Sequence, residues 1–253
     1  TVAGHVSQTS QHIPVDVVNV LDISGSMSAP FGSQTKMQAA KNALTSFNNN
    51  MQPAQGDQVG LVTFPLMQSG SGYNYSCTQN GSTSTYYYGQ VRNTLTSNIS
   101  AVNNTINGLN PNGGTPLAGG LLQGRQTVLG TNHRAGNVPV LIVASDGLAN
   151  IRGQWTGFSG NSYSSVSCNS GAEQDALDQA NIPKADANGD GVPDVIIYSI
   201  AVGDDFNPAL LQAIASPDTD PTRPHYFRAT DAASMQSIYQ QIANQVQTIG
   251  SEC

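Results

Sequence analysis

The stretch Pro14–Met27, PVDVVNVLDISGSM, decides how this chain folds. Its first part is almost continuously apolar and rich in β-branched residues, which predicts a strand buried on both faces of a sheet. The run ends in Asp22-Ile23-Ser24-Gly25-Ser26, where a carboxylate and two hydroxyls occupy alternate positions and Gly25 lets the backbone turn tightly. Three small oxygen ligands at the carboxyl end of a central strand suit a hard divalent cation, above all Mg²⁺.

Two later stretches supply matching oxygen ligands. Gly113-Gly114-Thr115-Pro116 offers a hydroxyl in a glycine-rich loop, and the apolar run 140–144 ends in Ser145-Asp146-Gly147. Taken singly, each piece is more often a solvated turn than a metal site, because Ser, Gly and Asp are common turn residues. The three pieces together, each at an expected strand end or loop, favour a single metal site.

Together these residues resemble the von Willebrand factor A (VWA) domain and its metal-ion-dependent adhesion site, whose motif is Asp-x-Ser-x-Ser, then a distant Thr and a distant Asp. The resemblance covers Pro14 to Val246, nearly the whole chain. It implies a Mg²⁺ or Mn²⁺ ion with an open coordination position that takes an Asp or Glu from a protein partner. The implied ligands are Asp22, Ser24, Ser26, Thr115 and Asp146.

Strands and amphipathic helices alternate along the chain, which predicts an α/β fold with a doubly wound, mostly parallel sheet, as in the Rossmann-like VWA fold. In such sheets ligands collect at the carboxyl ends of the strands. We expect strands over 15–21, 58–64, 86–91, 138–145, 195–202 and 226–228. We expect helices over 34–51, 98–109, 117–129 and 172–181, from 208 onward, and over 232–247.

The predicted domain spans 14–248, between an N-terminal arm (1–13) and a C-terminal tail (249–253). Two turn-rich inserts, about 65–85 and 150–171, show no helical or strand period. The VWA strand order implies that the strands preceding these inserts flank the first strand, so both inserts should rise around the metal. Aromatic residues among Ser, Gly and Asn are typical of adaptable protein-binding surfaces, although Tyr also packs loops. The expected ligand-binding residues are Tyr73, Tyr75, Trp155, Phe158 and Tyr163.

The chain has three cysteines, of which Cys77 and Cys168 lie in the two inserts and Cys253 ends the sequence. Two loop cysteines in an export-like composition indicate a disulfide. A Cys77–Cys168 bridge would tie the inserts together and leave Cys253 over. The alternative is a pair of unrelated surface loops whose thiols are free or paired differently.

A second metal signature lies at 186–194, DANGDGVPD. It resembles the D-x-[DN]-x-[DN]-G core of calcium loops, but Ile197 stands where an EF-hand has its bidentate Glu. The segment is therefore closer to the short calcium loops of dockerin-like and thrombospondin-like repeats, and we expect Ca²⁺ in a structural role at the opposite end of the sheet. A turn without metal is the alternative. The expected ligands are Asp186, Asn188, Asp190, Asp194 and the carbonyl of Val192.

Composition narrows the class of protein. Charged residues are 10% of the 253 residues and the net charge is −7, which argues against nucleic acid and against anionic membrane surfaces. Apolar runs are too short for a membrane span, so we expect no membrane insertion. A surface of neutral polar residues is common in secreted and cell-surface proteins. None of the four histidines (His5, His12, His133, His225) adjoins a strand-end serine or has metal-ligand spacing, so we expect no enzyme.

The leading interpretation is an extracellular adhesion or assembly module of a bacterial surface, pilus or filament protein. The SGSM and GGTP segments and HYFRATDAASMQSIYQQIA (225–243) are similar to VWA domains of tight-adherence pilus-associated proteins. Two alternatives stay open. One is a structural subunit of a surface polymer that assembles with itself or with pilus subunits. The other is the cytosolic VWA subunit of a chelatase-type ATPase complex, which the loop cysteines and low charge disfavour.

Overall fold

The computed structural model describes residues 12–65, 75–79, 82–86, 89–150 and 171–249. Its centre is a six-stranded sheet in the order β10-β9-β8-β1-β4-β7. Strand β7 runs antiparallel to β4, and the other neighbours are parallel, which confirms the doubly wound, mostly parallel fold. The strands are β1 (Val15–Asp22), β4 (Gln58–Phe64), β7 (Gln90–Thr96), β8 (Val138–Ser145), β9 (Ile196–Val202) and β10 (Tyr226–Ala229).

Strand β1 is the middle of the molecule. All eight of its residues are buried, as expected for a strand covered on both faces. It pairs with β4 on one side and β8 on the other, so that Asp22 lies opposite Phe64 and Leu21 opposite Ala144. The strands at 58–64 and 138–145 thus flank the first strand, as the family resemblance implied.

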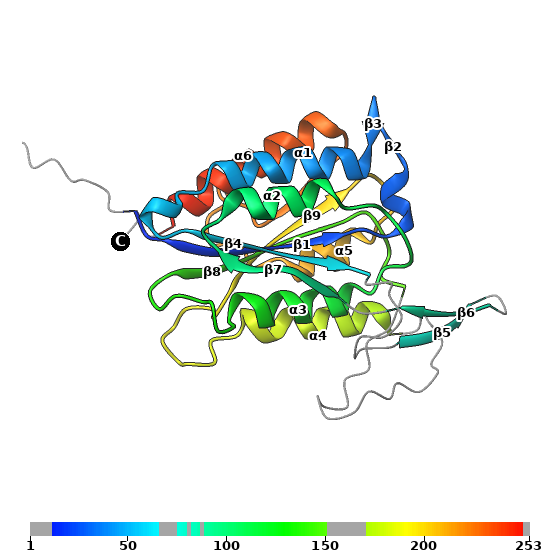
Figure 1. Ribbon diagram of the computed structural model, residues 1–253. Coiled ribbons are helices and arrows are strands. Elements are labelled where there is room, and N and C mark those ends of the chain that lie inside the picture. Colours follow the sequence, from blue (N-terminus) through cyan, green and yellow to red (C-terminus); the bar gives the residue numbers. More distant parts are fainter. Residues whose placement is uncertain (1–11, 66–74, 80–81, 87–88, 151–170, 250–253) are drawn as a thin grey trace, which may run out of the picture.

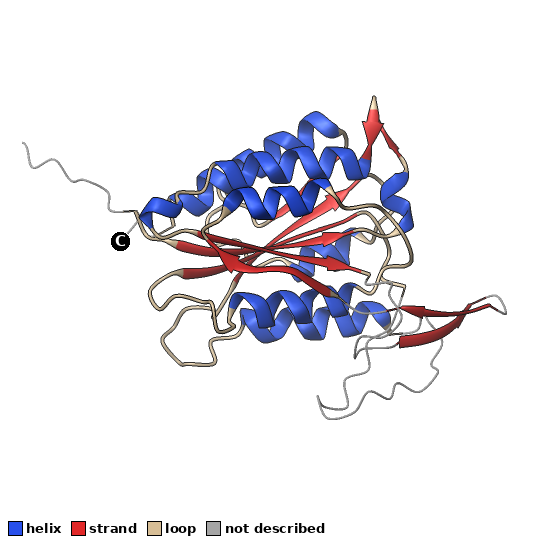
Figure 2. Cartoon of the chain, in the orientation of Figure 1, coloured by secondary structure: helices blue, strands red, loops and turns tan. Residues whose placement is uncertain are grey.

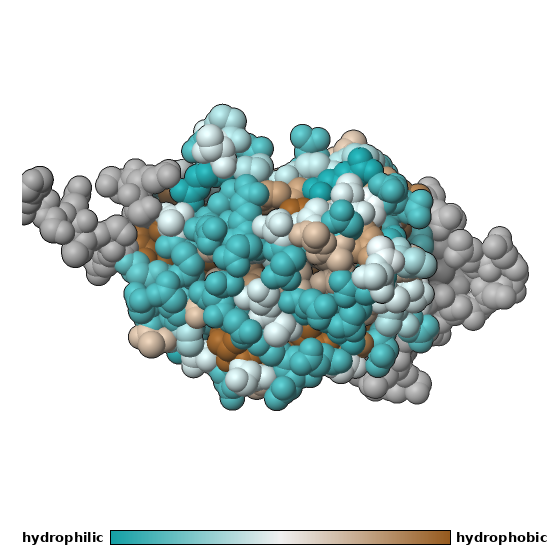
Figure 3. All heavy atoms as spheres, turned by 90° about the horizontal axis from the view of Figure 1, so that it is seen from above, coloured by the Kyte–Doolittle hydropathy of each residue, from teal (hydrophilic) through white to brown (hydrophobic). Residues whose placement is uncertain are grey.

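Helices cover both faces of the sheet (Figures 1 and 2). On one face lie α1 (Lys36–Asn49), α2 (Ile99–Asn107) and α6 (Ala232–Gln247), and on the other α3 (Leu117–Val128), α4 (Ala172–Lys184) and α5 (Pro208–Ile214). Each layer encloses its own apolar core. Viewed from above, the outer surface is mostly hydrophilic, with apolar patches between the polar residues (Figure 3). Among the described helices, none combines the length and apolar character needed to cross a bilayer.

Several short elements were not expected. The 3₁₀ helix η1 (Gly25–Ser28) and the two-stranded ribbon of β2 (Pro30–Phe31) and β3 (Gln34–Thr35) connect β1 to α1. A second 3₁₀ turn, η2 (Pro53–Gln55), leads toward β4. Helix α1 therefore begins two residues later than expected, because the Thr35 side chain caps it by accepting the N–H of Gln38 at 3.1 Å.

The region after β4 departs most from expectation. The insert at 65–85 was predicted to lack strands, but β5 (Tyr75–Gln79) and β6 (Ser82–Tyr86) pair as an antiparallel hairpin. Asn-Gly between two Thr/Ser/Tyr-rich runs is a hairpin signal that sequence reasoning passed over. The edge strand expected at 86–91 is instead β7 at 90–96, because Leu95 is the residue that enters the core, with 2% exposure.

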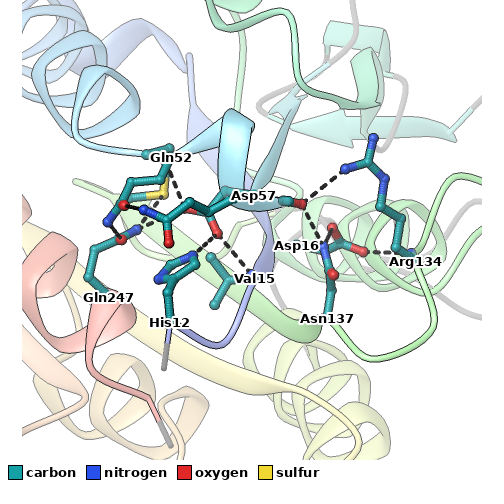
Figure 4. A network of polar contacts seen from close by, with 11 residues as sticks. His12, Val15, Asp16, Gln52, Asp57, Arg134, Asn137 and Gln247 are labelled. Atoms are coloured by element: carbon teal, nitrogen blue, oxygen red, sulfur yellow. Dashed lines mark hydrogen bonds and ion pairs between the residues drawn. The ribbon is translucent and has the colours of Figure 1, made fainter. Parts of the chain in front are cut away.

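Two buried aspartates lie at the end of the sheet where the parallel strands begin, and each binds several neighbouring segments (Figure 4). The Asp57 carboxylate accepts the N–H groups of Val15 and Gln52 at 3.1 and 2.8 Å. It also contacts His12 Nε2 and Gln247 Nε2, both at 2.9 Å. The segment before β1, the turn before β4 and the end of α6 therefore meet on one side chain.

Asp16 does the same for the turn that leads into β8. Its carboxylate contacts His133 Nδ1 at 2.7 Å and accepts the Arg134 N–H at 2.9 Å and the Asn137 side-chain amide at 2.7 Å. Figure 4 shows Arg134 and Asn137 beside it, and both also donate to the carbonyl of Gly56. These hydrogen bonds satisfy a carboxylate that is fully buried.

Candidate metal centre

Asp22 stands at the carboxyl end of β1 and is fully buried. One carboxylate oxygen, Oδ1, accepts the backbone N–H of Ser24 at 2.7 Å, which turns the chain back over the strand end. The other oxygen, Oδ2, accepts the hydroxyl of Ser145 at 2.6 Å. Both oxygens are therefore held by the ends of two neighbouring strands, β1 and β8.

The two predicted serines lie between Asp22 and Asp146 and connect them through hydrogen bonds. The hydroxyl oxygens of Ser24 and Ser26 lie 2.9 Å apart, and Ser26 donates to Oδ1 of Asp146 at 2.7 Å. Ser24 and Asp146 are buried, whereas Ser26 is exposed. The cluster thus opens to solvent on the side of Ser26.

Backbone hydrogen bonds bring the glycine-rich loop to the same place. The N–H of Gly25 donates to the carbonyl of Gly113 at 2.9 Å, and Thr115 is fixed through its N–H to Oδ1 of Asn150 at 2.8 Å. A Cβ atom built on Gly147 would lie 3.0 Å from Thr115 Oγ1 and 3.8 Å from Ser26 Oγ. The two hydroxyls therefore converge beside Gly147, and a side chain at 147 would crowd them.

The electrostatics of the cluster favour a cation. The pKa of Asp22 is raised to about 7, chiefly by burial and also by the nearby charge of Asp146, while the hydrogen bonds from Ser145 and Ser24 act to lower it. Two buried carboxylates at one strand edge are unfavourable unless positive charge compensates them. A divalent ion would supply that charge, and the hydroxyl and carboxylate oxygens are the donors that Mg²⁺ and Mn²⁺ accept. The residues present therefore fit such an ion.

The structure brings all five predicted ligands together at the carboxyl ends of the central strands: Asp22, Ser24, Ser26, Thr115 and Asp146. Sequence reasoning missed three residues that hold them. Ser145 and Asn150 bind Asp22 and Thr115, and Lys36 Nζ lies 2.8 Å from Oδ2 of Asp146. The only signal for Ser145 was its place at the end of an apolar run, and nothing local marked Lys36 as buried.

Most of the predicted ligand-binding surface lies outside what the structure describes. Tyr73, Trp155, Phe158 and Tyr163 are among those residues, and of Tyr75 only the strand backbone is described. The predicted Cys77–Cys168 bridge falls there as well, since Cys168 is not described. The hairpin of β5 and β6 extends from the metal-centre end of the sheet (Figure 1).

The acidic loop 186–194 precedes β9 and therefore lies at the opposite end of the strands from Asp22, as expected (Figure 1). Its side chains accept backbone N–H groups: Asp186 from Gly189, Asp190 and Gly191, Asn188 from Asp190, and Asp190 from Val192. Gly189 and Gly191 adopt positive φ values of 77° and 88°. Among the described residues no three His, Cys, Asp or Glu side chains gather as a metal cluster. Here the loop is shaped by its own backbone donors.

The amino-acid sequence of the chain matches a known family of protein domains. The von Willebrand factor type A domain profile matches residues 16–241. No curated protein sequence matches the chain.

Solved structures with the same fold include two pilus proteins and one matrix protein. The vWF domain of the type V pili tip protein Mfa5 from Porphyromonas gingivalis has a TM-score of 0.62 at 19% identity, covering 96% of this chain and 97% of that one. The pilus adhesin SpaC from Lactobacillus rhamnosus GG gives 0.60 at 20%, covering 93% and 31%. Proximal thread matrix protein 1 from the mussel byssus, with a zinc-occupied MIDAS motif, gives 0.59 at 18%, covering 92% and 46%. The chain thus spans less than half of the last two proteins.

Proposed function

Because the chain belongs to the von Willebrand factor type A domain family, we propose that it is an extracellular adhesion or assembly module. It binds a protein ligand through a divalent ion held by Asp22, Ser24, Ser26, Thr115 and Asp146. The ligand presents an Asp or Glu side chain, whose carboxylate completes the coordination of the ion. Mg²⁺ is the expected ion, and Mn²⁺ has the same ligand preference.

The observation that carries this proposal is the balance of charged and neutral ligands in the cluster. Of the five side chains, only Asp22 and Asp146 carry charge, and the others are hydroxyls. The two carboxylates balance the formal charge of a divalent ion and the hydroxyls add none, so the bound ion is not surrounded by excess negative charge and can accept an incoming carboxylate. Ser26 is exposed, so the ion would be reachable from solvent. Leu148, which follows Gly147 in the sequence, is 54% exposed and offers an apolar contact.

The similar folds of a pilus tip protein and a pilus adhesin support a surface location and a role in adhesion or assembly. A bacterial pilus or filament component is the narrower form of the proposal. The byssus matrix protein keeps open a structural role in a surface polymer, in which the partner is another copy of the same chain. Electron microscopy of the purified protein distinguishes that case, because a polymer subunit forms filaments without an added ligand.

The proposal is binding without catalysis. The three described histidines contact carboxylates: His12 contacts Asp57, His133 contacts Asp16 and His225 contacts Asp218. The carboxylates of the first two pairs lie at the opposite end of the strands from Asp22. A catalytic triad would also need a serine or cysteine nucleophile beside such a histidine–carboxylate pair.

We further propose Ca²⁺ at the loop 186–194, through Asp186, Asn188, Asp190, Asp194 and the Val192 carbonyl. The alternating oxygen ligands and the positive φ of Gly189 and Gly191 support this assignment. The ion would have a structural role, because the loop lies away from the metal centre.

The test of the metal centre is Asp22→Ala. We expect calorimetry to show Mg²⁺ or Mn²⁺ binding by the native protein and none by the variant, because the variant lacks a central carboxylate ligand. The fold should persist, since the substitution also removes a buried charge. Asp178→Ala, on the exposed face of α4, is the control and should bind the ion normally.

Capture of a partner from the native cell surface in Mg²⁺, and its loss with a chelator or in Asp22→Ala, tests the ligand-binding half. Unchanged metal affinity in Asp22→Ala would refute the site, and capture that persists in chelator would refute the role of the ion.

A further inference from the structure

Lys36 is a charged residue on the buried face of α1, beside the metal centre. It is the first residue of α1 and is 6% exposed. Burial disfavours an ammonium group, and the positive end of a helix dipole disfavours a cation in the first turn. Its Nζ lies 2.8 Å from Oδ2 of Asp146, whose side chain is fully buried. A strong local interaction must therefore compensate both unfavourable terms, and Asp146 supplies it.

The fold also leaves room for this side chain. Gly203, directly after β9, has a φ of +84°, and a Cβ there would lie 2.9 Å from Lys36 Cε and 3.1 Å from Nζ. The backbone of Gly203 is fixed by its N–H to the carbonyl of Ala229 at 2.8 Å. The end of the lysine therefore passes close to Gly203, where a side chain would crowd it, and its ammonium meets the Asp146 oxygen that does not bind Ser26.

The two oxygens of Asp146 are thereby divided between two partners. Oδ2 binds the ammonium of Lys36, and Oδ1 binds the hydroxyl of Ser26, which is one of the proposed ligands. The ammonium thus fixes the rotation of the carboxylate and presents one oxygen to the rest of the cluster. It also neutralises one of the two buried negative charges.

We propose that Lys36 is the resident cation of the metal centre. In the absence of metal it holds Asp146 in place and compensates its charge, so that the centre keeps its shape. Once a divalent ion is bound, the ion and the ammonium together outweigh the two carboxylates by one positive charge, which is available to a partner's carboxylate. This inference rests on the proposed metal site and gives that site an excess of one positive charge, which its five ligands alone do not provide.

The experiment replaces the charge and measures metal binding and stability. Lys36→Met keeps the length of the side chain, and Lys36→Gln keeps a hydrogen-bond donor without charge. Lys41→Met is the control, because Lys41 lies on the same helix and binds the carbonyl of Asn107 away from the centre. Calorimetry with Mg²⁺ and Mn²⁺ alone, and thermal unfolding with Mg²⁺ or with chelator, are the two readouts.

We expect both Lys36 variants to bind the ion more tightly, on the order of tenfold, because a like charge near the ion is gone. Their melting temperature should fall in chelator and recover with Mg²⁺, so the increase produced by Mg²⁺ is larger than in the native protein. Lys41→Met should behave as the native protein in both readouts.

A lysine with a purely structural role would lower the melting temperature equally with and without Mg²⁺ and would leave metal affinity unchanged or weaker. Either result would overturn the inference. If Lys36→Met fails to fold in chelator, Lys36→Gln decides between the two outcomes. Absence of metal binding by the native protein would instead contradict the proposed function, so the two failures are distinguishable.

Discussion

Asp22 couples the metal centre to pH. Its pKa is raised from 3.8 to about 7 in the folded protein without metal, chiefly because it is buried. Between these two values the unfolded chain has already lost the proton that the folded protein still holds. The folded state binds more protons there, so the free energy of unfolding falls as the pH rises through this window.

We therefore expect the melting temperature in chelator to fall between about pH 4 and pH 7 through this residue. With saturating Mg²⁺ the decline should be smaller, because the ion stabilises the ionised carboxylate. Asp22→Asn, which has no proton to lose at this site, serves as the reference for all other groups. If its profile in chelator matches that of the native protein, Asp22 does not titrate in this range.

The site residues differ in how well the sequence revealed them. Asp22, Ser24 and Ser26 follow directly on an apolar strand, so their position at its carboxyl end could be inferred from local order alone. Lys36 could not, because its burial results from the turn η1, the β2–β3 ribbon and the close approach to Gly203, which belongs to a distant strand end. The compensation of a buried charge depends on tertiary contacts that no local pattern encodes.

Helix α3 packs closely on the sheet because two of its glycines face it. A Cβ on Gly120 would lie 2.4 Å from Phe64 Cδ1, and one on Gly124 would lie 2.6 Å from Val20 Cγ2. The helix begins two residues after Thr115, so its distance from the sheet also sets the position of that hydroxyl. The close packing of one element therefore bears on the geometry of the site.

Gly120→Ala tests this coupling. Alanine favours a helix over glycine by about 1 kcal/mol, but overpacking a core costs about 1–3 kcal/mol, so we expect a net loss of stability. Mg²⁺ affinity should fall as well, because the helix must move away from Phe64 and take Thr115 with it. Gln126→Ala, on the exposed side of α3, provides the control for helix propensity. A variant as stable as the native protein would show that Phe64 can move aside freely.

Elements with a clear apolar pattern, either continuous or at helical spacing, were predicted within a residue or so, as β4, β8 and α6 show. The apolar pattern of such an element shows which of its residues are buried, and this indicates where the element begins and ends. Strand β7 was misplaced because its residues alternate little and only Leu95 is deeply buried. An edge strand is fixed by its neighbour's hydrogen bonds rather than by its own side chains, so its register was not recoverable.

At the scale of the whole molecule, the two proposed ion sites lie at opposite ends of the strands and should act independently (Figure 1). In an Asp22→Ala background, Ca²⁺ should raise the melting temperature by binding the loop 186–194. Mass action predicts a gain of about 2.7 kcal/mol at roughly a hundred times the dissociation constant. Asp190→Ala should abolish the gain. No rise with Ca²⁺ would mean that the loop is a turn without metal, and a rise that survives Asp190→Ala would locate the ion elsewhere.

The buried carboxylate of Asp57 has a mechanical consequence. It joins the segment before β1 to the end of α6 at the end of the sheet opposite the metal centre. A force applied between the metal centre and that opposite end would act along β1, which is hydrogen-bonded to the parallel strands β4 and β8 on its two sides. Tension would then load those hydrogen bonds in shear, all at once, instead of opening them one after another from an end. The central strand would thus transmit such a force between the two ends of the sheet.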